Sequence, residues 1–148
     1  MTEHSVAHAD FTLERRYRAS VADTFAAWSD ADAKARWFAG PDARHSLDFR
    51  AGGVETVDTA LADGRRVVFE STYRDIRPQA RIVYSSTLST EGVLATVSIT
   101  TVEFASDGSG TLLVLTEQDT YLDGQELPDW RRAGTETWLD ALGSDLDK

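Results

Sequence analysis

The sequence predicts an α+β fold in which a long C-terminal helix packs across a curved antiparallel sheet. Three observations carry this prediction. Apolar and polar residues alternate with a period of two in residues 11–19 and again in most of residues 45–121, as in half-buried strands. The turns between the later segments are too short for helical crossovers, so neighbouring strands run antiparallel. Residues 128–146 instead place their apolar side chains on one helical face.

The chain has 148 residues, and we expect a single domain over residues 11–148 after a loose N-terminal leader of residues 1–10. Its formal net charge of -10 argues against nucleic acid and an anionic membrane as partners, because both would be repelled. No apolar run approaches the roughly 18 residues that a membrane span needs. The chain has no cysteine, which fits a reducing cytoplasm and leaves neither disulfides nor thiolate metal ligands.

The first strand and two short helices come next. Phe11, Leu13 and Tyr17 alternate with polar residues and predict a strand from residue 11 to residue 19. Ser20 then starts a capping box, because its hydroxyl can accept a hydrogen bond from the amide of Asp23. A second short helix begins near residue 30 and ends at residues 40 and 41, where glycine is followed by proline.

The rest of the sheet follows without a further helix. Gly52-Gly53 predicts a bulge or a tight bend, and Asp63-Gly64 is a hairpin turn signal. With the first strand, these segments predict a sheet of six to seven strands. The later strands start near residue 45 and continue over residues 66–75, 81–88, 94–104 and 111–121.

The C-terminal segment, Pro128 to Leu146, has the clearest helical period. Pro128 suits the first turn of a helix. Arg131 lies near the middle of the apolar face, where an unpaired guanidinium is costly to bury. We therefore expect it to extend its charge to solvent, or to pair internally with Glu117 or an anionic ligand group. The apolar half of the helix carries Trp130, Gly134, Trp138, Leu139, Ala141, Leu142 and Leu146.

Several short motifs resemble a known family in their order and spacing. They include Leu13-Glu14-Arg15, Arg36-Trp37-Phe38, Asp48-Phe49-Arg50-Ala51-Gly52-Gly53, Arg81-Ile82-Val83-Tyr84 and Trp138-Leu139-Asp140-Ala141-Leu142. Over residues 11–146 the chain resembles the START-like (SRPBCC) superfamily of helix-grip proteins and, within it, the family of activators of the heat-shock protein 90 ATPase. The resemblance implies a helix-grip fold with a cavity for an apolar or amphipathic small molecule. The family's usual Gly-Trp pair in the last helix is Thr137-Trp138 here.

Eight residues are candidates for contacting a molecule in that cavity. Aromatic side chains supply contact area and tyrosine hydroxyls orient a ligand, although core packing is the competing interpretation for each of them. Glu117 alternates with Leu113 and Leu115, so it points inward if they do, unless the strand frays into solvent. The candidates are Trp37, Phe69, Tyr73, Tyr84, Glu117, Tyr121, Arg131 and Trp138.

The sequence predicts neither a metal site, nor a cofactor, nor an assembled set of catalytic residues. His4 and His8 fall in the leader and His45 stands alone, so we expect structural or solvent roles for them. No Ser/His/Asp arrangement is supported by these positions, and no glycine-rich phosphate loop joins a strand to a helix.

The first functional hypothesis is non-catalytic binding of a small hydrophobic or amphipathic molecule, with a stress response as one context. One alternative is a cyclase- or hydrolase-type enzyme, which needs Glu117 or Asp119 in the cavity beside Arg131 or Tyr84. Another is a chaperone-interacting module. The sequence is compatible with a monomer and with a homodimer, and it does not identify the ligand.

Overall fold

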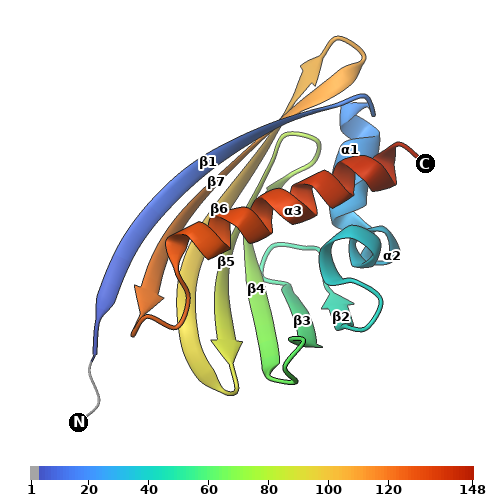
Figure 1. Ribbon diagram of the computed structural model, residues 1–148. Coiled ribbons are helices and arrows are strands. Elements are labelled where there is room, and N and C mark those ends of the chain that lie inside the picture. The colour runs from blue at the N-terminus through green and yellow to red at the C-terminus, as the bar shows by residue number, and fades with distance from the viewer. Residues whose placement is uncertain (1–3) are drawn as a thin grey trace.

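A computed structural model describes residues 4–148 and shows a curved sheet with helices on one face (Figure 1). These residues form the predicted α+β helix-grip fold. The strands are β1 (Val6–Tyr17), β2 (Arg44–Leu47), β3 (Val54–Ala60), β4 (Arg66–Arg77), β5 (Arg81–Thr90), β6 (Val93–Asp107) and β7 (Gly110–Leu122). The helical elements are α1 (Val21–Ser29), α2 (Ala31–Lys34), the π-helical turn η1 (Ala35–Ala39) and α3 (Pro128–Leu146).

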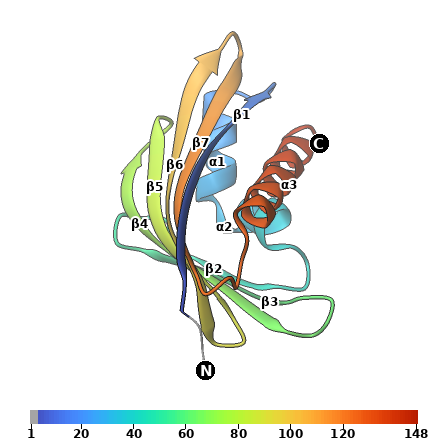
Figure 2. The same ribbon diagram turned by 60° about the vertical axis from the view of Figure 1, so that its left-hand side comes forward.

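Within residues 4–148 the seven strands form one antiparallel sheet in the order β1-β7-β6-β5-β4-β3-β2. Two irregularities interrupt the ladders, one between Tyr73 and Asp75 in β4 and one between Leu88 and Ser89 in β5. Irregularities of this kind bend a strand and increase its twist. The strands curve around α3, which lies on the concave side of the sheet (Figure 2).

The first strand begins at Val6, five residues before the predicted start at Phe11. It pairs with β7 from Val6 opposite Leu122 to Tyr17 opposite Thr111. The predicted leader of residues 1–10 is therefore too long, because residues 6–10 belong to the sheet although their side chains are mostly exposed. Residues 1–3 of that leader lie outside the described part of the chain.

Side-chain caps start the two short helices. The Ser20 Oγ accepts from the Asp23 amide at 3.1 Å, as the capping box predicts, and Asp30 Oδ2 accepts from the Ala33 amide at 2.9 Å. The helix that starts after Asp30 changes to π-helical geometry at Ala35 and ends at Gly40, whose φ is 84°. A positive φ at this position suits glycine, which confirms the predicted end of the segment.

The terminal helix has the bounds that its apolar period predicts, and its buried residues are Arg131, Thr135, Leu139 and Leu142. The Tyr17 hydroxyl donates to the Leu139 carbonyl at 2.8 Å and joins β1 to this helix. Trp130 is an exception to the prediction, because its residue is 61% exposed at the start of the helix.

Aromatic side chains fill the end of the core beneath α1, α2 and η1. The indole of Trp28 contacts those of Trp37 and Trp138 at ring-centroid distances of 4.9 and 5.9 Å. Phe25 packs edge to face on Phe104 at 5.3 Å. This end of the molecule is therefore closed by side chains, and the open volume lies beside the first half of α3.

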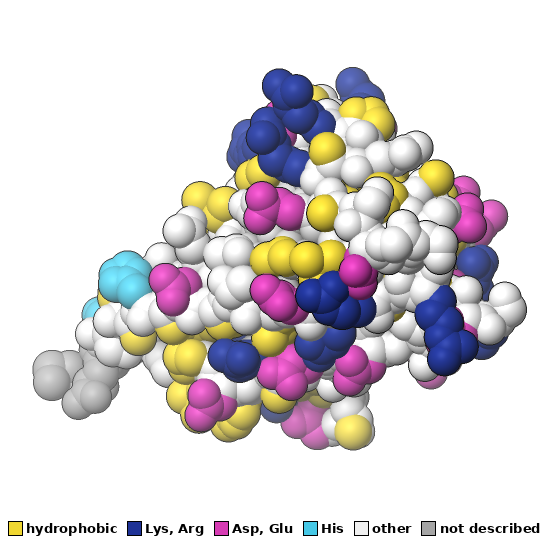
Figure 3. Space-filling view, turned by 90° about the horizontal axis from the view of Figure 1, so that it is seen from above, with side chains coloured by type: hydrophobic (Ala, Val, Ile, Leu, Met, Phe, Trp, Pro, Cys, Tyr) yellow, Lys and Arg dark blue, Asp and Glu magenta, His cyan; other side chains and the backbone are white. Residues whose placement is uncertain are grey.

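Acidic and basic side chains are interspersed over the face of the molecule seen in Figure 3. On that face the negative net charge of the chain is not gathered into one patch. Among residues 4–148, no helix has the length and apolar character needed to cross a membrane.

Candidate functional site

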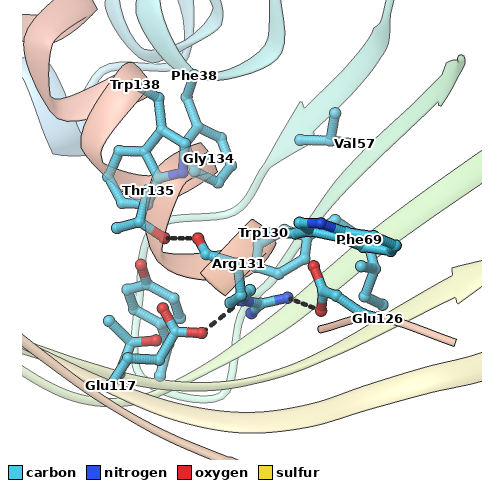
Figure 4. Close-up of a pocket in the computed structure, with 13 residues that line it drawn as sticks. Phe38, Val57, Phe69, Glu117, Glu126, Trp130, Arg131, Gly134, Thr135 and Trp138 are labelled. Carbon is cyan, nitrogen blue, oxygen red and sulfur yellow. Dashed lines mark hydrogen bonds and ion pairs between the residues drawn. The ribbon is translucent and has the colours of Figure 1, made fainter. Parts of the chain in front are cut away.

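A cavity with a volume of about 220 Å³ lies between the first half of α3 and the concave face of the sheet (Figure 4). Strands β3 to β7 each contribute inward-facing side chains, η1 contributes Phe38 at one end, and the loop before α3 contributes Glu126 at the other. The lining residues are Phe38, Val57, Phe69, Tyr84, Leu88, Thr100, Glu117, Glu126, Trp130, Arg131, Gly134, Thr135 and Trp138.

Arg131 is the central polar group of this cavity. Its Nε donates to Glu117 Oε1 at 2.6 Å, its Nη1 to Glu126 Oε1 at 3.4 Å and its Nη2 to Ser98 Oγ at 3.0 Å. The guanidinium carbon also lies 5.3 Å from the ring centroid of Phe69. Figure 4 shows the guanidinium between the two carboxylates. Of the three arrangements expected for Arg131, internal pairing with Glu117 is the one present.

Glu117 is held in a largely dry environment. Its residue is 2% exposed, because β7 presents Glu117, Asp119 and Tyr121 on the same inward face as Leu113 and Leu115. The pKa of Glu117 is raised to about 8, chiefly by burial; Arg131 opposes the shift and the nearby Asp119 adds to it. Near neutral pH Glu117 therefore holds a proton and can still accept the Arg131 hydrogen bond on its Oε1.

Arg131 stays charged for a complementary reason. Burial disfavours its charged form, but Glu117, Glu126 and Asp119 together raise the pKa of the guanidinium. Three carboxylates around one guanidinium cannot all be ionised without leaving excess negative charge in the interior. Protonation of Glu117 relieves part of that excess, so a neutral Glu117 and a charged Arg131 are consistent with each other.

Asp119 has an incomplete set of partners. Its Oδ2 accepts from the Tyr121 hydroxyl at 2.7 Å, whereas its Oδ1 is buried with no hydrogen-bond partner among the described residues. Asp119 is close enough to Glu117 and Arg131 to affect the pKa of each, but it does not line the cavity. The sheet side of the site thus holds more carboxylate oxygens than donors.

A second buried charge cluster lies behind the wall of the cavity. Lys34 is fully buried, and its Nζ lies 2.5 Å from Glu55 Oε1 and 3.1 Å from the Tyr73 hydroxyl. Tyr73 donates to the same Glu55 oxygen at 2.7 Å, and His45 Nε2 lies 2.8 Å from Glu55 Oε2. The Lys34 Nζ is also 4.4 Å from the ring centroid of Phe38, whose side chain lines the cavity.

The protonation states of this cluster follow from burial and pairing. Burial lowers the pKa of Lys34, and Glu55 opposes that shift. Burial alone would raise the pKa of Glu55, but Lys34 and hydrogen bonds from His45 and Tyr73 lower it instead. Lys34 and Glu55 therefore form a closed pair with matched charges, and His45 is part of it rather than isolated as the sequence suggested.

Five of the eight predicted site residues line the cavity, namely Phe69, Tyr84, Glu117, Arg131 and Trp138. Their role in binding stays a prediction. Trp37 lies in the core, where its Nε1 donates to the Ala27 carbonyl at 3.0 Å. Tyr73 is bonded into the Lys34 cluster, and Tyr121 turns its hydroxyl to Asp119. These three aromatic residues are inward-facing, but they do not border the open volume.

Sequence reasoning missed both Glu126 and the Lys34 cluster. Glu126 lies in a loop, where no period indicates which way a side chain points; it accepts from Thr96 Oγ1 at 2.5 Å as well as from Arg131. For Lys34, one signal was available. It is one of only two lysines in the chain and directly precedes the Ala-Arg-Trp-Phe segment that enters the core.

The architecture defines a helix-grip protein of the START-like class, in which sheet and terminal helix enclose a cavity. Residues 18–146 match the family described as Activator of Hsp90 ATPase homolog 1-like protein, and the chain belongs to that family. No curated protein matches the chain.

Solved structures of bacterial proteins share the fold. A protein from Rhizobium leguminosarum is 38% identical, with a TM-score of 0.95 and coverage of 99% of both chains. One from Rhizobium loti is 37% identical, with a TM-score of 0.90 and coverage of 95% of this chain and 99% of the other. A Chromobacterium violaceum protein at 23% identity has a TM-score of 0.79, covers 94% and 97%, and shows the fold alone.

Proposed function

We propose that the protein binds a small amphipathic molecule in the cavity between α3 and the sheet. The observation that carries this proposal is the combination of an open volume of about 220 Å³ with aromatic walls and a few convergent polar groups at one end. Small-molecule sites in proteins have this composition. The exposed Trp130 and the partly exposed Glu126 mark the side from which a ligand enters.

The size of the cavity restricts the ligand. A volume of 220 Å³ equals that of about seven water molecules in the liquid, at about 30 Å³ each. It is smaller than the roughly 300–1,000 Å³ of sites for drug-sized ligands. A molecule with one or two aromatic rings and one polar head group fits these limits, and phenolic compounds are the first class to test.

The proposal is tested by calorimetry and thermal denaturation with a panel of one- and two-ring aromatic compounds. At a ligand concentration of 100 times the Kd, binding to the folded state adds about 2.7 kcal/mol, which raises the Tm of a domain this size by roughly 5–10 °C. The blocking variant is Gly134→Leu, because Gly134 lines the cavity and an added Cβ there meets nothing within 4 Å.

Ala133→Leu is the matched control, since Ala133 is exposed on the same helix and does not line the cavity. Binding should be lost in Gly134→Leu and retained in Ala133→Leu. A panel compound that binds all three proteins equally would show that the cavity is not the site.

A cyclase- or hydrolase-type enzyme is the second candidate, and one observation favours it. A general acid works best when its pKa lies near the working pH, and burial raises the pKa of Glu117 to about 8 inside a cavity that also contains Arg131 and Tyr84. Each compound that binds would be incubated with wild-type protein and with Glu117→Gln, followed by mass spectrometry. Conversion by the wild type alone would support catalysis, and conversion by neither would leave binding as the function.

A further inference from the structure

We propose that the cavity selects an organic cation, a protonated amine attached to an aromatic ring system, over neutral and anionic ligands of the same shape. This inference rests on the proposed function, because it specifies the head group of the molecule that the cavity binds. Three features of the site point to it: the balance of charges, the aromatic walls and the carboxylates that already pair with Arg131.

The balance of charges at the polar end of the cavity is negative. Glu117, Asp119 and Glu126 surround the single guanidinium of Arg131, and the residues that line the cavity include no other basic side chain. With Glu117 protonated, Asp119 and Glu126 leave an excess of one negative charge over the guanidinium, and ionisation of Glu117 raises that excess to two. Lys34 does not offset it, because its ammonium lies behind Phe38 and is paired with Glu55 at 2.5 Å.

The walls of the cavity suit a cation. The faces of aromatic rings attract an ammonium group, most strongly when water is excluded. Two of these rings already form cation–π contacts within the protein. The Arg131 guanidinium carbon lies 5.3 Å from the ring centroid of Phe69, and the Lys34 Nζ lies 4.4 Å from that of Phe38. The aromatic residues that line the cavity are Phe38, Phe69, Tyr84, Trp130 and Trp138.

Among the residues that line the cavity, Arg131 is the only basic one, and three of its five N–H donors already have partners. Its Nε, Nη1 and Nη2 already donate to Glu117, Glu126 and Ser98 (Figure 4). A ligand carboxylate would have to share the guanidinium with two carboxylates that already bind it, and it would add a further negative charge beside Asp119, whose Oδ1 is buried with no partner among the described residues. An anionic ligand is therefore disfavoured mainly by charge.

Cation binding should be linked to a proton. Burial raises the pKa of Glu117 to about 8, so much of this side chain is protonated at pH 7. A cation placed beside it favours the ionised carboxylate and lowers that pKa. Binding of an amine at pH 7 should therefore release a proton, and affinity should increase as the pH rises toward 8. A neutral ligand of the same shape should release none.

Three probes with the same ring system separate the possibilities: 2-naphthylmethylamine, 2-naphthalenemethanol and 2-naphthoate. Their affinities are measured by calorimetry at pH 7 in buffers of different ionisation enthalpy, which reports proton release. We expect the amine to bind about tenfold or more tighter than the alcohol, and the carboxylate to bind weakest.

A pair of variants separates the local charge from the net charge of -10. Glu126→Gln removes one carboxylate at the rim of the cavity, where its side chain is 16% exposed. Glu136→Gln removes the same charge from the exposed Arg132–Glu136 pair elsewhere on α3. With Glu126→Gln the amine should lose about threefold to tenfold more affinity than the alcohol, and Glu136→Gln should leave the affinities of both unchanged.

The outcomes are distinguishable. The order amine, alcohol, carboxylate, with proton release for the amine alone, supports the inference. An alcohol that binds as tightly as the amine, or a carboxylate that binds tightest, overturns the inference and leaves the proposed binding function intact. If none of the three probes binds, the binding function fails and the head-group preference fails with it.

Discussion

Replacing Lys34 by methionine is expected to lower the free energy of unfolding by about 3–5 kcal/mol, because it leaves a buried carboxylate without its cation. Lys34 and Glu55 have exposed side-chain fractions of 0% and 1%, so water cannot take the place of the ammonium group. Methionine keeps a similar length and fills the space between the rings of Trp28 and Phe38. The loss is therefore one of charge pairing rather than of packing.

Replacing Glu55 as well tests whether the loss in Lys34→Met comes from the unpaired charge. In the double variant Lys34→Met/Glu55→Gln no charge is left uncompensated, and the glutamine can still bond to His45 and Tyr73. Replacing a buried ion pair by neutral groups is often close to neutral in stability. We expect the double variant to be more stable than Lys34→Met by about 2 kcal/mol, a coupling that independent sites do not show.

Urea unfolding followed by tryptophan fluorescence measures these differences. With an m-value of about 2 kcal/mol/M, a loss of about 4 kcal/mol lowers the midpoint by roughly 2 M. Arg132→Met is the control, because it breaks the exposed Arg132–Glu136 pair at 3.1 Å and should cost less than about 1 kcal/mol. A Lys34→Met cost as small as that of the control, or a double variant less stable than Lys34→Met, would refute the reasoning.

Three further predictions concern stability. In Glu117→Gln the free energy of unfolding should depend less on pH than in the wild type. Folded wild-type protein keeps a proton on Glu117 that the unfolded chain loses above about pH 4.5. The stability of the wild type therefore falls as the pH rises from about 4.5 to about 8. Equal slopes in urea titrations from pH 5 to 9 would contradict the raised pKa. Gly134→Ala should add about 0.5–1 kcal/mol, because glycine disfavours a helix interior and the new Cβ has free space; a lower urea midpoint would show otherwise. Tyr17→Phe should cost about 1 kcal/mol, because the hydrogen bond to Leu139 is lost. An unchanged midpoint would mean that this bond contributes nothing net.

Local patterns were sufficient to predict most of the fold. The terminal helix has the predicted bounds, Pro128 to Leu146, because its apolar period and its proline are properties of neighbouring residues. The Ser20 cap is equally local. The start of β1 at Val6 was missed because backbone pairing with β7 extends the strand past the last buried side chain, and exposed side chains leave no alternation to detect.

The sequence predicted which side chains of the candidate site face inward, but not which of them border the cavity. Alternation along β7 predicted an inward Glu117 on the condition that the strand did not fray, and the helical wheel placed Arg131 on the apolar face with Glu117 as one of its possible partners; the structure shows that pairing. The same patterns could not separate Tyr84, which lines the cavity, from Tyr121 and Tyr73, whose hydroxyls bond to buried carboxylates. Which inward positions border open volume depends on how far α3 lies from each strand, and that distance is not a local property.

The two buried charge clusters differ in a way that assigns them different roles. Glu55 is matched by Lys34 and bonded by His45 and Tyr73, and no oxygen of that cluster lacks a partner among the described residues. Because its polar groups are all paired with one another, this cluster has a structural role and no free group for a ligand.

Around Arg131, by contrast, carboxylates outnumber cations, one Asp119 oxygen has no partner within residues 4–148, and the cluster borders a cavity. Phe38 and Tyr84 separate the clusters, because both rings lie near the Lys34 ammonium and both line the cavity that contains Arg131. The clusters differ in their balance of charges. The Lys34 cluster contains its own ammonium group, whereas the Arg131 cluster has the space and the negative charge to receive one.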